Sequence, residues 1–260
     1  MKTKKRIGQH FLFNTNILLK IVGAAHVNPD DTVVEIGSGL GTLTRQLAVR
    51  AARVIAIEID SDLVKRAGEA LSSTVNVEIV HKDALKFDFA QIGYPFKVVS
   101  NIPYSITTPL VFRLLEFQHM IQSMTLLVQK EVGERMVAKP GGKDYGVLSI
   151  AIQTRIRPEI VFTVPNTAFR PVPKVDSSLV SFEMPMNPPY IIRDYEFFMK
   201  VVRTAFLHRR KTILNCLKSF PEIKEILIQE GIDPMTRPEQ LSIETFISLS
   251  SKLNKSWTKN

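Results

Sequence analysis

Several features are scarce or missing in this chain of 260 residues, and each absence excludes a class of protein. A single cysteine, Cys216, excludes an intrachain disulfide and fits a reducing compartment, so we expect a cytoplasmic protein. The five histidines show no metal-ligand spacing, so no metal site is predicted. No run of 18 or more apolar residues is present, so we expect no membrane span and no membrane partner.

Other signals of special architecture are absent as well. We do not expect the basic amino-terminal segment to be a signal peptide, because Asn14, Asn16 and Lys20 interrupt its apolar part. Internal repeats and low-complexity segments are missing. What is present is a hydrophobic content of 45%, enough to fill a core, and a net charge of +9. That charge predicts a polyanionic partner, with nucleic acid favoured over a membrane surface.

One glycine-rich loop follows a predicted buried strand, residues 32–36, and precedes a predicted helix, residues 42–51. A strand, a glycine loop and a helix form the first unit of a doubly wound α/β fold. The spacing in Gly37-Ser38-Gly39-Leu40-Gly41 is G-x-G-x-G, and Thr42 stands where a dinucleotide-binding fingerprint needs its third glycine. The glycines therefore indicate close approach of another ligand to the backbone.

The motif Asn101-Ile102-Pro103-Tyr104 follows a strand predicted over residues 96–100. The Asn101 side-chain oxygen and the Ile102 carbonyl can accept both N–H groups of an exocyclic ring amine, which returns the lone pair of the amine to its nitrogen. Pro103 aims that carbonyl, and Tyr104 offers a ring face on which a base stacks, worth about 1–3 kcal/mol. A plain turn that closes a strand is the alternative for these four residues taken alone.

Acidic residues end two further predicted strands. Glu58 ends the strand at residues 53–59 and can accept the hydroxyls of a ribose. Asp83 and Ala84 follow the strand at residues 75–81, and they can accept from an adenine amine and donate to the same ring. The carboxyl ends of parallel strands meet at one edge of a sheet. Ribose, adenine and an amine-holding motif at one edge indicate S-adenosylmethionine, which needs no phosphate cradle.

The rest of the chain divides into two predicted domains, 1–186 and 187–260, at Asn187-Pro188-Pro189. The second is helical, with breaks at Phe220-Pro221 and Asp233-Pro234. The proline-stiffened segment 169–176 is either a rigid crossover or a wall of the substrate cleft. Further helices are predicted at 16–25, 107–116, 130–138 and 147–154, and further strands at 124–128, 159–164 and 177–182.

Taken in order, these motifs resemble the ribosomal RNA adenine dimethyltransferase family, which includes KsgA and its archaeal and eukaryotic Dim-type relatives. The resemblance covers nearly the whole chain, and residues 137–141 and 187–189 look closer to the archaeal and eukaryotic branch. Its motifs are Gly8-Gln9, Glu35-x-Gly37-x-Gly39-x-Gly41, Asn101-Ile102-Pro103-Tyr104, Phe169-Arg170-Pro171 and Arg209-Arg210-Lys211.

The resemblance implies a Rossmann-like methyltransferase domain and a small helical carboxy-terminal domain. We expect a monomer, because nothing in the sequence suggests an obligate partner chain. It implies N6,N6-dimethylation of two adjacent adenosines in the 3′-terminal hairpin loop of small-subunit rRNA. His10 replaces the asparagine usual in bacterial members, and Ile102 replaces the commoner leucine. Cofactor contacts are implied for Gln9, His10, Leu12, Gly37, Gly39, Glu58, Ile59, Asp83, Ala84 and Asn101. Contacts with the target base are implied for Asn101, Ile102, Pro103 and Tyr104. Separately from the resemblance, the basic arm, the proline-stiffened loop and the basic helix predict RNA contacts for Lys4, Lys5, Arg6, Arg170, Lys174, Arg209, Arg210 and Lys211.

Three alternatives remain open from the sequence. The first is a large-subunit rRNA methyltransferase of the macrolide-resistance type, whose catalytic motifs barely differ. The second is a DNA adenine methyltransferase, which usually carries an acidic residue where Asn101 stands. The third is a non-enzymatic RNA-binding or assembly factor on the same scaffold, and the intact motif residues argue against it.

Overall fold

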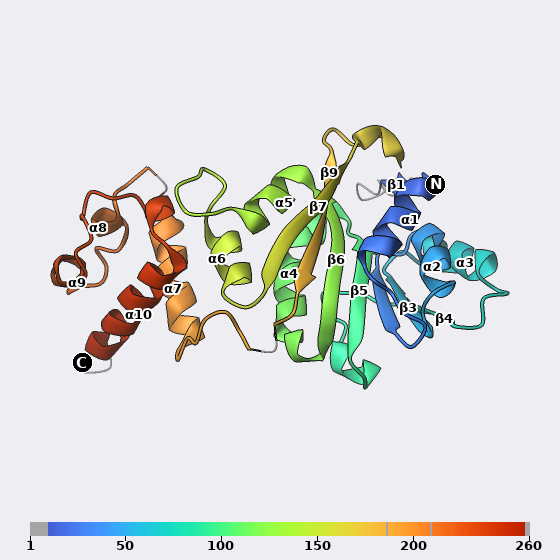
Figure 1. The fold of residues 1–260 in the computed structure, drawn as a ribbon, viewed down its shortest axis with the longest axis horizontal. Helices are drawn as coiled ribbons and strands as arrows, with labels where there is room; N and C mark the ends of the chain where they lie inside the picture. The colour runs from blue at the N-terminus through green and yellow to red at the C-terminus, as the bar shows by residue number, and fades with distance from the viewer. Residues whose placement is uncertain (1–9, 186, 209, 258–260) are drawn as a thin grey trace. The chain divides into compact units, whose positions relative to one another are not determined.

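The apolar runs that end in polar residues form one sheet of seven strands in the computed structural model, which describes residues 10–185, 187–208 and 210–257 (Figure 1). The strand order is β4-β3-β2-β5-β6-β9-β7. The first five strands pair in parallel, and β9 pairs antiparallel with both β6 and β7, which confirms the predicted doubly wound α/β fold. The strands are β2 (Thr32–Ile36), β3 (Arg53–Glu58), β4 (Val77–His81), β5 (Phe96–Asn101), β6 (Ile121–Gln129), β7 (Arg157–Val164) and β9 (Ser177–Glu183).

Three helices of this region lie close to their predicted ranges: α1 (Thr15–Ala24), α2 (Thr42–Ala48) and α4 (Thr107–Glu116). A fourth, α3 (Ser61–Ala70), was not predicted. Its signals are present in the sequence, because Asp60 caps the amino terminus through the N–H groups of Asp62 and Leu63. The structure also adds a two-residue ribbon of β1 (Phe11–Leu12) and β8 (Phe169–Arg170), which pair antiparallel.

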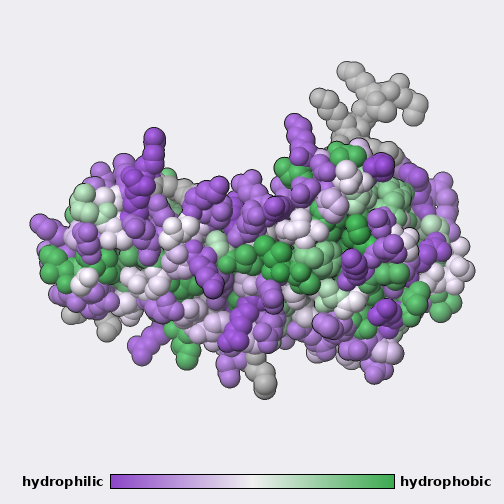
Figure 2. Space-filling view, turned by 45° about the horizontal axis from the view of Figure 1, so that its top comes forward, coloured by the Kyte–Doolittle hydropathy of each residue, from purple (hydrophilic) through white to green (hydrophobic). Residues whose placement is uncertain are grey.

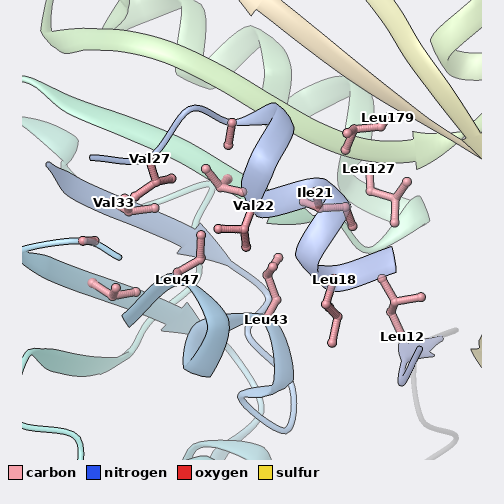
Figure 3. Close-up of a cluster of buried hydrophobic side chains, with 14 of the residues drawn as sticks. Leu12, Leu18, Ile21, Val22, Val27, Val33, Leu43, Leu47, Leu127 and Leu179 are labelled. Atoms are coloured by element: carbon pink, nitrogen blue, oxygen red, sulfur yellow. The ribbon is translucent and has the colours of Figure 1, made fainter. Parts of the chain in front are cut away.

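Helices α1 and α2 bury their apolar sides against one face of the sheet (Figure 3). Burying one such aliphatic side chain contributes about 1.5–3 kcal/mol. Helix α4 lies on the opposite face (Figure 1). The cluster in Figure 3 joins residues from β1, both helices and the strands, among them Leu12, Leu18, Ile21, Val22, Leu43, Leu47, Val33, Leu127 and Leu179.

The chain forms two compact units, and their limits differ from the predicted domains in one segment. The first unit runs to Gly133 and includes Arg157–Met184, so its end lies close to the predicted boundary after residue 186. The second unit contains the residues from Pro185 onward and also Glu134–Ile156. That inserted segment belongs there because it packs on the helices of the second unit, where the Tyr195 hydroxyl donates to the Ala151 carbonyl at 3.3 Å.

The second unit is helical, as predicted, and both predicted breaks lie between helices. Asp194 caps α7 by accepting from the Phe197 N–H at 2.8 Å. The Phe206 ring lies 6.2 Å from Tyr145 and 5.8 Å from Phe246, so aromatic packing ties the inserted segment to the last helix. The helices are α5 (Lys130–Val137), which begins in the first unit, α6 (Val147–Gln153), α7 (Tyr195–Phe206), α8 (Ile213–Cys216), α9 (Ile223–Gln229) and α10 (Ile243–Trp257).

The surface is mainly hydrophilic on the face shown in Figure 2, with smaller hydrophobic areas between the charged side chains. None of the helices in the described part of the chain combines the length and the apolar character that a membrane crossing requires.

Candidate functional site

The strand order changes direction between β2 and β5, and the polar residues that follow these two strands meet there. The ladder between the two strands pairs Val33 with Lys97 and Val34 with Val98. Beyond these pairs, the Ser100 hydroxyl donates to the Ile36 carbonyl at 2.5 Å. In open α/β sheets, such a reversal creates a crevice at the carboxyl ends of the strands.

A cavity occupies this crevice, and it brings together eight of the residues predicted from sequence. They are His10, Leu12, Gly37, Gly39, Asn101, Ile102, Pro103 and Tyr104. The glycine loop after β2 thus faces the Asn-Ile-Pro-Tyr motif after β5. Six further residues complete the lining: Phe11, Leu18, Glu35, Ser38, Thr42 and Leu43.

Glycines are required at two positions of the loop because its backbone lies against other lining residues. Gly37 has φ +73°, and a Cβ there would lie 2.9 Å from Cδ of Pro103. Gly39 has φ +58°, and a Cβ there would lie 3.0 Å from the Phe11 ring. A larger residue at either position would push the loop away from the motif or from β1.

Glu58 lies outside the cavity lining but holds the glycine loop in place. Its buried carboxylate accepts from the Gly39 N–H at 2.9 Å through Oε2, and from the Ile59 and Asp60 N–H groups at 2.9 and 3.0 Å through Oε1. These three bonds use three of about four acceptor sites on a carboxylate. Glu58 therefore has room for one further donor, fewer than the two ribose hydroxyls expected from sequence.

The other predicted adenosine contacts follow the neighbouring strands β3 and β4 and do not line this cavity. Asp83 accepts from the Leu85 N–H at 3.0 Å, and Ala84 is buried. Ile59 is 58% exposed, and the His81 ring bonds its carbonyl at 3.1 Å. These residues lie along the same edge of the sheet as the cavity, and their contact with a cofactor remains a prediction.

Asn101 ends β5, and its side-chain amide is oriented by the backbone of His10, which directly precedes β1. The Nδ2 group of Asn101 donates to the His10 carbonyl at 3.3 Å. A carbonyl accepts but cannot donate, so this contact selects the amino end of the amide. The acceptor end, Oδ1, has no protein donor among the described residues and is the end available to a ligand. The Ile102 N–H donates to the Leu127 carbonyl at 3.1 Å, which fixes the start of the motif to β6.

Tyr104 is held at two places. Its hydroxyl bonds the Ser177 hydroxyl at 2.7 Å, and its ring lies 5.5 Å from the His10 ring at an interplanar angle of 33°. The His10 ring in turn bonds the Pro171 carbonyl at 2.7 Å. Burial raises the pKa of Tyr104 above its ordinary value, although the Ser177 bond opposes this shift, so the phenol is neutral at physiological pH.

Glu35 and Ser38 line the cavity but were not assigned as site residues from sequence. Glu35 is buried, and the Thr44 hydroxyl bonds its Oε2 at 2.5 Å. Burial raises the pKa of Glu35 to about 8, against the opposing Thr44 bond, and the nearby Glu58 raises it further. The Ser38 hydroxyl is buried without a hydrogen-bond partner among the described residues. The available signal was their position in the sequence, because Glu35 stands two residues before the first glycine of the loop and Ser38 stands within it.

This residue set fits S-adenosylmethionine. Gly37 and Gly39 line the cavity without a side chain, so a ligand there can approach the backbone of the loop. The buried Ser38 hydroxyl has no partner among the described residues and can bond a polar group of a ligand. Glu58 has one acceptor site left, which can accept from a ligand hydroxyl. Among the described residues, no cluster of cationic side chains lines the cavity, in keeping with a cofactor that carries no phosphate.

The predicted RNA-contacting residues are spread over both units. Arg170 lies in β8, and its guanidinium donates to the Thr167 and Phe169 carbonyls at 3.2 and 3.0 Å. Lys174, Arg210 and Lys211 are exposed. The segment that carries Arg170 contacts β1 and His10, so this part of the loop adjoins the cavity. Lys4, Lys5, Arg6, Gln9 and Arg209 lie outside the described residues.

Comparison with known proteins places these motifs in one family. The family described as "Ribosomal RNA adenine dimethylase" matches residues 1–255. A protein of Moorella thermoacetica named "Ribosomal RNA small subunit methyltransferase A" is 47% identical, over 96% of this chain and 92% of its own. Relatives of the same name from Geobacillus and Bacillus are 44–45% identical. These relatives are bacterial, so they do not support the expected closeness to the archaeal and eukaryotic branch.

Two solved structures share the fold over nearly the whole chain. A dimethyladenosine transferase from Plasmodium falciparum has a TM-score of 0.77 and 28% identity, covering 95% of this chain and 98% of its own. The 23S rRNA methyltransferase ErmE has a TM-score of 0.73 and 30% identity, covering 94% and 99%. The first unit therefore has the Rossmann-like methyltransferase fold predicted from sequence.

Proposed function

Because the chain belongs to the ribosomal RNA adenine dimethylase family, we propose that it transfers methyl groups from S-adenosylmethionine to N6 of two adjacent adenosines in small-subunit rRNA. The observation that carries this proposal is the orientation of Asn101, whose Nδ2 is taken by the His10 carbonyl while Oδ1 is available beside the glycine loop. The small subunit is favoured over the large subunit by the names of the curated relatives.

The residues of the motif divide the work of holding the target base. Asn101 Oδ1 and the Ile102 carbonyl accept the two N6 hydrogens, so the nitrogen lone pair is less drawn into the purine ring. Tyr104 stacks on the base, which is turned out of a single-stranded loop into the cavity. The cofactor, when bound, supplies a methyl group made electrophilic by its sulfonium.

Catalysis by these residues is mainly positioning. The glycine loop and Glu58 hold the cofactor side of the cavity, and the motif after β5 holds the base side. No strong general base is required, because the amine becomes acidic as it takes the methyl group and its proton can leave to water. Asn101 is neutral, so no anion lies beside the acceptor-rich edge of adenine.

The biological setting follows from the substrate. We propose that the chain acts as a monomer in the cytoplasm, on rRNA within a small ribosomal subunit or its precursor, without a membrane partner. The net charge of +9 supports an RNA partner, since phosphate contacts dominate affinity for nucleic acids.

The decisive experiment is transfer of a tritiated methyl group from S-adenosylmethionine to small subunits isolated in the unmethylated state. We expect N6,N6-dimethyladenosine in digested small-subunit rRNA and no labelling of naked large-subunit rRNA or DNA. Labelling of large-subunit rRNA alone would instead support the activity of the ErmE type, which the 30% identity to that structure makes the second candidate.

The role of Asn101 is tested by Asn101→Ala. Loss of the amide acceptor should lower single-turnover methyl transfer by roughly 100-fold or more, since orientation and charge stabilisation at the reacting atom are lost. Affinity for S-adenosylhomocysteine, measured by calorimetry, should change much less. Asn215→Ala, an exposed site in the second unit, serves as the matched control. Full activity of Asn101→Ala would remove the assigned role.

A further inference from the structure

Ser177 lies at the far end of the Tyr104 ring, away from the backbone of the Asn-Ile-Pro-Tyr motif. The two hydroxyls are 2.7 Å apart, although the residues are 73 positions apart in the sequence. Tyr104 itself begins a short 3-10 turn, Tyr104–Ile106, directly after Pro103. The ring is therefore fixed at its backbone end by the proline and at its hydroxyl end by the serine.

The hydroxyl of Ser177 is mounted on a rigid part of the sheet. Ser177 is fully buried and begins β9, where it pairs with Gln129 of β6 on one side and Val164 of β7 on the other. The preceding residue, Asp176, accepts from the Lys130 N–H through its carbonyl and from the Asn166 N–H through its carboxylate, both at 3.0 Å. Ser177 thus cannot follow Tyr104 if the ring swings.

We propose that Ser177 is a positioning residue for the target base, because its hydrogen bond fixes the hydroxyl end of the Tyr104 ring and so the direction in which the ring, on which that base stacks, extends from the backbone. The inference rests on the proposed function and adds a residue outside the cavity lining. A base that lands on a preset ring presents N6 to Asn101 in one orientation. A ring whose hydroxyl end is free to swing presents it in many, and transfer slows even when the base still binds.

A merely structural role predicts something different. A partly buried tyrosine hydroxyl needs a partner, and Ser177 would then only satisfy it. In that case the damage from removing one hydroxyl comes from the other being left unpaired, and removing both restores the protein. The neighbouring Ser178 offers a matched comparison, because its hydroxyl is buried but has no partner among the described residues.

The experiment compares Ser177→Ala, Tyr104→Phe, the double variant and Ser178→Ala. Single-turnover methyl transfer to unmethylated small subunits is measured with the native protein in the same assay, together with calorimetric affinity for S-adenosylhomocysteine and the midpoint of urea unfolding. Activity of the native protein tests the proposed function separately. Tyr104→Phe removes the same hydrogen bond by deleting the tyrosine hydroxyl, so it still tests the proposal if Ser177→Ala does not fold.

We expect Ser177→Ala and Tyr104→Phe each to slow transfer by roughly tenfold, with cofactor affinity unchanged. The double variant should be about as slow as either single variant, even where its unfolding midpoint recovers. Ser178→Ala should match the native rate. Native rates in Ser177→Ala and Tyr104→Phe, or a double variant that regains both stability and rate, would overturn the positioning role.

Discussion

Glu35 is a described residue whose pKa lies far above its ordinary value. It is the acidic member of the buried strand β2, and the structure leaves it only 2% exposed. In the described part of the chain, the groups that act on its carboxyl are the Thr44 hydroxyl and the Glu58 carboxylate. A carboxyl in such surroundings keeps its proton, because burial disfavours the charged form.

This state makes the stability of the protein depend on pH. The unfolded chain loses the Glu35 proton near its ordinary pKa of 4.5, whereas the folded protein keeps it until about 8. Between these values the unfolded state binds fewer protons, so the free energy of unfolding should fall as pH rises, by up to about 1.4 kcal/mol per pH unit from this group. Above about pH 8 the contribution becomes constant.

Glu35→Gln removes this titration and keeps the side-chain volume. The variant should gain stability relative to the native protein as pH rises from 5 to 8, measured by urea unfolding at several pH values. The two proteins compared at the same pH provide the control for every other titrating group. Parallel stability curves for the two proteins would show that Glu35 is ionised in the fold.

The loop between β2 and α2 joins the two halves of the cavity through a backbone contact. A Cβ at Gly37 would meet Cδ and Cγ of Pro103 at 2.9 and 3.0 Å, and φ of +73° is strained for any other residue. The loop and the motif after β5 therefore share one packing surface. A substitution in the loop should therefore disturb the base-holding motif and the cofactor side of the cavity together.

Gly37→Ala tests this coupling. We expect a loss of stability of about 1–3 kcal/mol, because the left-handed backbone and the contact with Pro103 both oppose a side chain. Cofactor affinity and transfer rate should fall together. Gly68→Ala is the matched control, since Gly68 lies in α3 with nothing within 4 Å of its Cβ position, and this change should stabilise by up to about 1 kcal/mol. A Gly37→Ala protein as stable as the native one would contradict the close packing.

Charge is a property of the whole chain, and it is carried in part by exposed cations of the second unit. Arg203, Arg210 and Lys211 are exposed there, close together in the sequence. The net charge of +9 attracts RNA at long range, but only residues at phosphates change the salt dependence of binding.

Replacing Arg210 and Lys211 by glutamine should weaken binding of small subunits without changing affinity for S-adenosylhomocysteine. For every phosphate that these two side chains neutralise in the native complex, the slope of log affinity against log salt concentration should become shallower by roughly 0.7–0.9. Lys218→Gln combined with Lys224→Gln, which removes two other exposed cations of the second unit, is the control for net charge alone. A slope identical to that of the native protein would place both residues away from the RNA.

The parts of the fold that depend on neighbouring residues can be predicted from the amino-acid sequence. Buried strands ending in polar residues, a glycine loop before a helix and proline breaks between helices all follow from local patterns, and the structure has them. The helix α3 carries an equally local signal in its Asp60 cap, although it was not among the predicted helices. The motif Asn101-Ile102-Pro103-Tyr104 could likewise be found as a short unit with its own chemistry.

The way in which those side chains are held depends on contacts between distant segments, which are seen only in the folded chain. The amide of Asn101 is oriented by a carbonyl 91 positions away, and the Tyr104 ring by a hydroxyl 73 positions away. The ribbon of β1 and β8 is two residues long on each side, too short to be seen in a sequence pattern. The buried state of Glu35 also arises only when α2 covers the strand. Contacts between distant segments depend on the packing of the whole unit, and local sequence patterns do not predict that packing.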